Sequence, residues 1–84
     1  MKAGAPATTE VDALGLLCPL PILRARDAAR RLPPGSTLIL WADDEAIVTD
    51  LPAWCEGQGH ALASLQRARH PGGEAAWRGE VVLR

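Results

Sequence analysis

The stretch Gly15–Pro21 (GLLCPLP) restricts the fold of this chain most tightly, because a strand has to end there and a helix has to begin. Gly15 interrupts the alternating pattern before it. Proline is tolerated in the first turn of a helix, where its missing N–H would have no intrahelical partner. With Cys18 as the N-cap, Pro19 is N1 and Pro21 is N3. The stretch therefore predicts a strand-to-helix turn that carries a cysteine.

Cys18 in this position is expected to be a reactive sulfur. The backbone N–H groups of Leu20 and Ile22 would point toward it, and a helix N-terminus lowers the pKa of a cysteine. A Cys-x-x-Cys redox pair would need a second cysteine where Pro21 stands. A persulfide or thioester on Cys18 could therefore persist and be handed on. The alternative is a cysteine that only fills space in the core, as this residue often does.

The segments on either side of the turn predict a short strand and an amphipathic helix. Thr9–Leu14 alternates weakly between apolar and acidic residues, which suggests a strand. The helix is expected from about Pro19 to Leu32, with a buried stripe formed by Ile22, Ala25, Ala28, Ala29 and Leu32. Pro33-Pro34-Gly35 ends it. Ser36–Ala42 is apolar nearly throughout, which fits a central strand buried on both sides.

A second helical segment follows, with Asp43-Asp44-Glu45 as its N-cap chemistry. Pro52 lies inside this segment and leaves two interpretations open. Either a short turn over Glu45–Thr49 precedes a new helix capped by Asp50, or one helix is kinked at Pro52. The apolar stripe of the segment consists of Ile47, Leu51, Trp54 and Cys55.

Two further strands complete the predicted fold. Gly57 or Gly59 ends the second helix, and His60–Gln66 is expected to be a strand. Arg67–Glu74 is expected to be a hairpin loop, followed by an alternating strand over Ala75–Arg84. Two helices cannot cover both faces of a four-stranded sheet. We therefore predict an α/β fold, a two-layer β-α-β-α-β-β sandwich in which both helices lie on one face of a four-stranded mixed sheet.

Composition restricts the functional classes. An 84-residue chain is expected to form one domain, here residues 9–84 after a flexible stretch over residues 1–8. A net charge of −1, one lysine and no tyrosine or phenylalanine argue against nucleic-acid binding. No apolar run approaches the ~18 residues of a membrane span, and the start does not resemble a signal peptide. Two cysteines are too few for a disulfide framework, so a reduced, cytoplasmic location is expected.

Five segments together resemble the TusA (SirA-like) sulfur-carrier family, whose hallmark is Cys-Pro-x-Pro. That hallmark stands at Cys18–Pro21, inside the matching stretch Asp12–Pro21. The other four segments are, in order, Pro34–Ser36, Ala42–Asp44, Asp50–Cys55 and Gly59–Leu62. The motif alone would be weak, but five segments in the right order and spacing make a specific resemblance over about residues 10–84.

The resemblance implies that Cys18 accepts sulfane sulfur from a cysteine desulfurase or a rhodanese-like donor. Cys18 would hold it as a persulfide and relay it to an acceptor protein, as a sulfurtransferase-type carrier that needs no cofactor. Pathways served in the family are tRNA thiolation, molybdenum-cofactor enzymes and sulfur oxidation. Pro19 and Pro21 would shape the turn, and the amides of Leu20 and Ile22 would hold the negative charge.

Two positions depart from the family pattern. Leu17 stands where arginine or lysine is frequent, and Leu20 where several members carry a polar residue. Both changes bear on partner recognition, so the donor and acceptor stay open. A non-catalytic, protein-binding regulatory module of the same fold and a selenium carrier are the alternatives.

The remaining candidates have plain structural interpretations. Cys55 is expected to pack in the core, and His60 to satisfy a turn, with proton transfer near Cys18 as an alternative. His70 is expected to be solvated, Trp41 to lie in the core or on the open sheet face, and no metal site is expected. The first predicted helix carries Arg24, Arg26, Arg30 and Arg31. These arginines either form a solvated face of the helix, or they flank the turn and attract an acidic partner.

Overall fold

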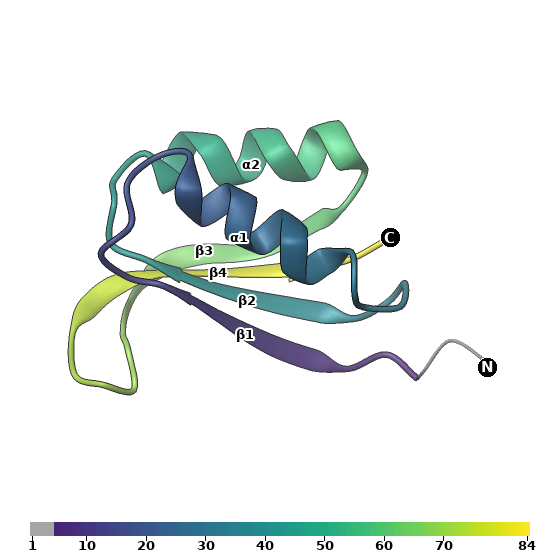
Figure 1. Cartoon of the computed structure of the whole chain (residues 1–84), viewed down its shortest axis with the longest axis horizontal. Coiled ribbons are helices and arrows are strands. Elements are labelled where there is room, and N and C mark those ends of the chain that lie inside the picture. The colour runs from purple at the N-terminus through teal and green to yellow at the C-terminus, as the bar shows by residue number, and fades with distance from the viewer. Residues whose placement is uncertain (1–4) are drawn as a thin grey trace.

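The computed structural model describes residues 5–84 and has the predicted β-α-β-α-β-β order (Figure 1). The expectation for residues 1–8 falls in part on residues 1–4, which lie outside the described residues. The elements are β1 (Thr8–Ala13), α1 (Leu20–Ala29), β2 (Thr37–Ala42), α2 (Ile47–Gln58), β3 (Ala61–Arg69) and β4 (Ala75–Val82).

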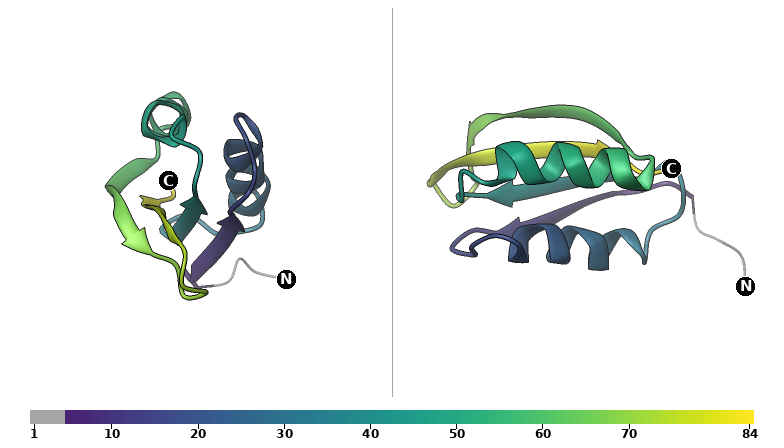
Figure 2. Two further views of the ribbon diagram at one scale, coloured as in Figure 1. Left: turned by 90° about the vertical axis from the view of Figure 1, so that its left-hand side faces the viewer. Right: turned by 90° about the horizontal axis from the view of Figure 1, so that it is seen from above.

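The four strands form one mixed sheet in the order β1-β2-β4-β3. β1 and β2 are parallel, whereas β4 is antiparallel to both of its neighbours. Both helices lie on the same face of this sheet (Figures 1 and 2), so the predicted fold class is confirmed. Each helix returns the chain from the end of one strand to the start of the next, which places both helix N-termini at the edge where β1 and β2 end.

The main core lies between the sheet and the two helices. Leu38 and Leu40 of β2 and Leu51 of α2 are at most 1% exposed there. Gly79 of β4 lies directly under α2, and a Cβ atom at this position would collide with the Leu51 side chain. The close contact between α2 and β4 therefore depends on a residue without a side chain.

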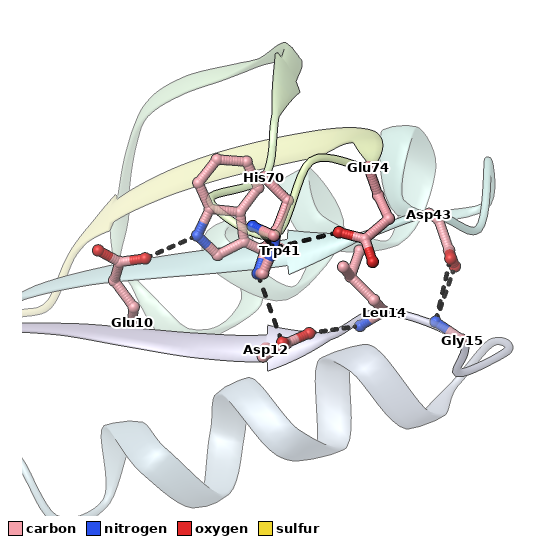
Figure 3. A network of polar contacts seen from close by, with 9 residues as sticks. Glu10, Asp12, Leu14, Gly15, Trp41, Asp43, His70 and Glu74 are labelled. Atoms are coloured by element: carbon pink, nitrogen blue, oxygen red, sulfur yellow. Dashed lines mark hydrogen bonds and ion pairs between the residues drawn. The ribbon is translucent and has the colours of Figure 1, made fainter.

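β2 is buried on both faces, as its apolar sequence predicts. Ile39 and Trp41 belong to a second, smaller cluster on the opposite face, together with Ala76 of β4. The ring of His70, in the β3–β4 loop, lies edge-on to Trp41 with 5.1 Å between ring centroids (Figure 3). Trp41 is 5% exposed, so it is a core residue.

The expected solvation of His70 is wrong. Its side chain is only 16% exposed, and its Nε2 atom lies 3.4 Å from a carboxylate oxygen of Asp12. Trp41 below it donates an indole N–H to Glu10 at 2.8 Å (Figure 3). The β3–β4 loop therefore folds against the sheet and covers its second face.

Several boundaries differ from the sequence prediction, among them the start of β1 at Thr8 and the end of β4 at Val82. α1 ends at Ala29, because the N–H groups of Arg31 and Leu32 bond to carbonyls three residues back, in a tighter turn. β3 continues to Arg69, since residues 67–69 pair with residues 75–77 of β4. α2 starts at Ile47 and is one continuous helix across Pro52 (Figure 1). Asp50 therefore does not cap a new helix.

Candidate functional site

Cys18 lies in the turn between β1 and α1, at the edge of the sheet where β1 and β2 end (Figure 1). Its side chain is exposed. α1 begins at Leu20 with Pro19 as its N-cap, so the expectation that Cys18 is the N-cap is wrong by one residue. Pro21 is buried in the first helical turn. The proline-containing start of the helix agrees with the prediction and presents Cys18 to solvent.

Two carboxylates that follow β2 hold this turn in place. Asp43 accepts the backbone N–H of Gly15 at 3.0 and 3.1 Å with its two oxygens. Asp44 accepts the N–H of Cys18 at 2.7 Å and that of Ala46 at 3.0 Å. These two backbone donors lower the pKa of Asp44. The sequence assigns Asp43 and Asp44 to capping α2, but the N-cap of α2 is Ala46, without a side-chain cap hydrogen bond. Asp43 and Asp44 instead fix the turn that carries Cys18.

The thiol of Cys18 donates a hydrogen bond to Asp50 Oδ2 with 2.8 Å between sulfur and oxygen. Asp50 lies in the first turn of α2. This hydrogen bond, with desolvation and the negative charges of Asp50 and Asp44, raises the pKa of Cys18. The expected low pKa is therefore wrong, because carboxylates from α2 and the loop before it outweigh the start of α1.

The predicted amide donors do not contact the sulfur. The N–H of Leu20 donates to the carbonyl of Leu17 at 2.8 Å. Ile22 is half-buried and packs against the main core. Within residues 5–84, the hydrogen-bond partner of Cys18 Sγ is the carboxylate of Asp50. In this arrangement the thiol donates a hydrogen bond to a carboxylate, and the sulfur accepts none from the helix backbone.

The arginines of α1 do not gather around Cys18. Arg31 pairs with Asp27 at 2.9 Å, one helical turn away, as its spacing predicts. Arg26 and Arg30 line a cavity at the opposite end of α1. Arg24 is exposed, and no ion pair between described residues joins any of the four arginines to Asp43, Asp44 or Asp50. Of the two interpretations of these arginines, the structure favours the solvated face, because the groups that contact Cys18 are acidic.

Exposed apolar side chains stand beside this acidic turn. Leu17 is 70% exposed and Leu20 is 47% exposed, on either side of Cys18 in the sequence. Val48, two residues before Asp50 in α2, is 43% exposed. Large exposed apolar side chains on the elements that carry Cys18 and Asp50 are candidates for an interaction surface. We refer to Leu17, Leu20 and Val48 as the apolar rim.

Cys55 and His60 lie away from the turn. Cys55 is 2% exposed in the main core, and burial raises its pKa to about 11, so the prediction that it packs there is confirmed. His60 follows the C-terminal end of α2, at the opposite end of the molecule from Cys18 (Figure 1). This position argues against proton transfer between His60 and Cys18.

A protein-family model described as sulfurtransferase TusA matches residues 9–74. The matched region contains Cys18, both prolines of the turn and Asp50. Neither helix of the described structure is long and apolar enough to cross a membrane. No cluster of three or more histidine, cysteine or carboxylate side chains suited to a metal ion occurs among residues 5–84.

Proposed function

The chain belongs to the sulfurtransferase TusA family, and on that premise we propose that Cys18 is the residue that carries sulfur, as a persulfide. Membership supports a general role in sulfur transfer. The specific proposal rests on the position of Cys18 Sγ. This thiol is exposed and lies 2.8 Å from a carboxylate oxygen of Asp50, on a turn that further hydrogen bonds hold in place. The other cysteine, Cys55, is buried and cannot meet a partner protein.

The transfer is an exchange without net oxidation. Cys18 Sγ attacks the outer sulfur of a persulfide on the donor protein, and a new sulfur–sulfur bond forms as the donor's own sulfur–sulfur bond breaks. The donor cysteine leaves as a thiolate, and Cys18 now carries the extra sulfur. Asp50 is placed to accept the thiol proton as Cys18 reacts, because the hydrogen bond between them already points that proton at the carboxylate.

The same carboxylates also act on the loaded state. A persulfide is more acidic than a thiol, so the loaded Cys18 would carry negative charge beside Asp44 and Asp50. Like charges in proximity raise the free energy of the ionised form. Release breaks the bond between Cys18 and the outer sulfur and leaves Cys18 as a thiolate, which the proton held by Asp50 can neutralise.

The partners would dock on the surface that surrounds Cys18. It combines the apolar rim with the carboxylates of Asp43, Asp44 and Asp50, and so it suits a partner with an apolar contact inside a basic border. Basic groups of the partner would offset the charges that raise the pKa of Cys18, which favours the thiolate when the partner is bound. A cysteine desulfurase or a rhodanese-like protein is the proposed donor, in the reducing cytoplasm.

The acceptor would be a protein of tRNA thiolation, of molybdenum-cofactor metabolism or of sulfur oxidation. The apolar rim also suits the alternative, a regulatory module that binds proteins without sulfur chemistry. A selenium carrier would use the same thiol in the same way.

Intact-mass spectrometry after incubation with a cysteine desulfurase and cysteine tests the proposal. We expect a mass gain of one sulfur atom that a reducing agent removes and that maps to Cys18. Cys18→Ser should abolish the gain, and Cys55→Ser should retain it. If neither a desulfurase nor a rhodanese-type donor loads the protein, the regulatory module becomes the better interpretation. Replacing the sulfur donor by a selenium donor in the same assay separates the two carriers.

A further inference from the structure

A cavity of about 440 Å³ lies at the end of the molecule opposite Cys18. Its walls come from the C-terminal ends of α1 and α2 and from the residues after β4, which come together at one end of the molecule (Figure 2). The ten residues of α1 rise about 15 Å along the helix axis and separate this cavity from the Cys18 turn. The cavity is therefore a separate feature, and nothing in the proposed sulfur transfer uses it.

The charged side chains that line the cavity are all basic. They are Arg26 in the last turn of α1, Arg30 directly after α1 and Arg84 after β4, and no aspartate or glutamate is among the lining residues. None of the three arginines forms an ion pair with an acidic side chain of residues 5–84. Guanidinium groups are suited to bind carboxylate and phosphate through paired hydrogen bonds. The cavity therefore favours an anion.

The ring of His60 adds one N–H donor to these guanidinium groups, and it packs against Trp54. His60 Nδ1 accepts the backbone N–H of Arg84 at 3.1 Å, so a neutral His60 carries its proton on Nε2, as a donor. The His60 ring packs against Trp54, with 5.0 Å between ring centroids. The indole Nε1–H of Trp54 is buried and has no acceptor among the described residues. Because this N–H is sealed from solvent, a molecule in the cavity would meet the face or edge of the Trp54 ring and not its N–H.

Apart from Gln58, the rest of the wall is apolar. Leu32, Pro34 and Leu83 line the cavity together with the indole of Trp54. The volume falls within the roughly 300 to 1,000 Å³ typical of small-molecule sites. An inorganic ion would leave this apolar wall in contact with water, whereas a molecule with an apolar body would cover it.

We propose that this cavity binds a small organic oxyanion, a carboxylate or phosphate group attached to an apolar or aromatic body. The charged group meets Arg26, Arg30 and Arg84, and the body lies against Leu83 and Trp54. Basic residues near a helix C-terminus also complement the helix dipole, which accounts for Arg26 in the last turn of α1. The helix dipole does not account for Arg84, which belongs to no helix.

The test is a nuclear magnetic resonance titration of the full ¹⁵N-labelled chain with phenyl phosphate and, separately, with benzoate. Inorganic phosphate supplies the charge without the body, and benzyl alcohol supplies the body without the charge. We expect a saturable shift of the Trp54 indole N–H signal, because the bound body lies against the Trp54 ring; Trp54→Phe identifies this signal by its loss. Phenyl phosphate or benzoate should bind more tightly than either control, and the tighter of the two identifies the anionic group.

Variants decide whether the arginines of the cavity are responsible. Arg26→Gln combined with Arg30→Gln should weaken binding by about tenfold or more. Arg24→Gln combined with Arg31→Gln removes the same charge from the same helix outside the cavity and should bind like the parent chain. If the first pair fails to fold, Arg84→Gln at the exposed chain end takes its place. Equal binding by the cavity variants and the control pair would overturn the proposal, as would a Trp54 signal that no probe shifts.

The result of this binding experiment does not depend on whether the protein transfers sulfur. Cys18→Ser should bind the probes as well as the parent chain does, because Cys18 lies at the other end of α1. A chain that loads sulfur but binds no probe would refute the cavity proposal alone. A chain that binds the probes but cannot be loaded would refute the sulfur-carrier proposal alone.

Discussion

The thiol of Cys18 donates a hydrogen bond of 2.8 Å to Asp50, a residue 32 positions further along the chain. Two elements meet in this contact: the turn before α1 and the first turn of α2. The carboxylate raises the pKa of the thiol, chiefly through this hydrogen bond. The resting protein therefore holds Cys18 as a thiol, a form that oxidants and alkylating agents attack slowly.

Replacing Asp50 by asparagine should make Cys18 more acidic. The amide keeps the size of the side chain but removes the charge that disfavours the thiolate. We expect the inflection of the iodoacetamide alkylation rate against pH to move to lower pH in Asp50→Asn, with several-fold faster alkylation below the inflection. Mass spectrometry assigns the alkylated residue as Cys18.

Asp27→Asn is the matched control for Asp50→Asn, because it makes the same chemical change at a carboxylate that pairs with Arg31 and does not contact Cys18. Its alkylation profile should coincide with that of the parent chain. An unchanged inflection in Asp50→Asn would show that the carboxylate does not control the thiol.

Cys55 should make stability depend on pH in the alkaline range. Its thiol is buried in the core, which raises its pKa from 9.0 to about 11. Below pH 9 the thiol is protonated in both the folded and unfolded states, and the stabilisation that follows from its raised pKa is complete. As the pH rises toward 11, the unfolded chain ionises first, so this stabilisation is lost.

Thermal unfolding of the parent chain and of Cys55→Ala, measured across the range from pH 7 to about pH 11, isolates this effect. We expect the variant to be less stable at pH 7, because it leaves a small cavity. The difference in Tm between the two proteins should narrow as the pH rises. A constant difference would mean that the thiol ionises equally easily in both states.

Gly79 should tolerate no side chain. A Cβ atom there would collide with Leu51 of α2, so we expect Gly79→Ala to lower the free energy of unfolding by about 1–3 kcal/mol. Gly57→Ala is the matched control, since a Cβ at Gly57 has nothing within 4 Å and the residue lies in the same helix as Leu51. That substitution should be neutral or stabilise by up to about 1 kcal/mol. Urea unfolding measures the free energy of unfolding of both variants. A similar loss of this free energy in Gly79→Ala and Gly57→Ala would contradict the steric explanation.

The order of the elements and the two layers could be predicted from the sequence, because apolar periodicity and helix breakers such as Pro33-Pro34-Gly35 are local signals. The extension of β3 to Arg69 could not, since it depends on pairing with residues 75–77. The covering of Trp41 by His70 likewise depends on how the β3–β4 loop folds back. Both are long-range contacts that no sequence window contains.

The candidate site likewise combines features that the sequence predicts with features that it does not. The turn at Cys18 and its prolines could be predicted, because proline and helix starts obey local rules. The ionisation state of Cys18 could not, since its hydrogen-bond acceptor Asp50 comes from another helix. One signal does point to Asp50: it opens the segment Asp50–Cys55, which resembles a segment of the family, although the resemblance alone assigns the carboxylate no role.

The two leucines beside Cys18 should serve partner docking and leave the chemistry of the thiol unchanged. Leu17 and Leu20 are 70% and 47% exposed, so replacing both by serine costs little folding energy. With a cysteine desulfurase that loads the parent chain, we expect Leu17→Ser combined with Leu20→Ser to raise the KM for the carrier several-fold. The maximal loading rate and the pH profile of Cys18 alkylation should stay the same.

Alanine-to-serine substitution at Ala53 and Ala63 is a suitable surface control, because both residues are exposed and lie on α2 and β3, outside the Cys18 turn. The control should load with the KM of the parent chain. If the leucine variant instead lost maximal rate at unchanged KM, the two leucines would act on the reacting sulfur, and the docking surface would have to lie elsewhere. A raised KM alone places the partner on the apolar rim, where contact brings its basic groups next to Asp44 and Asp50.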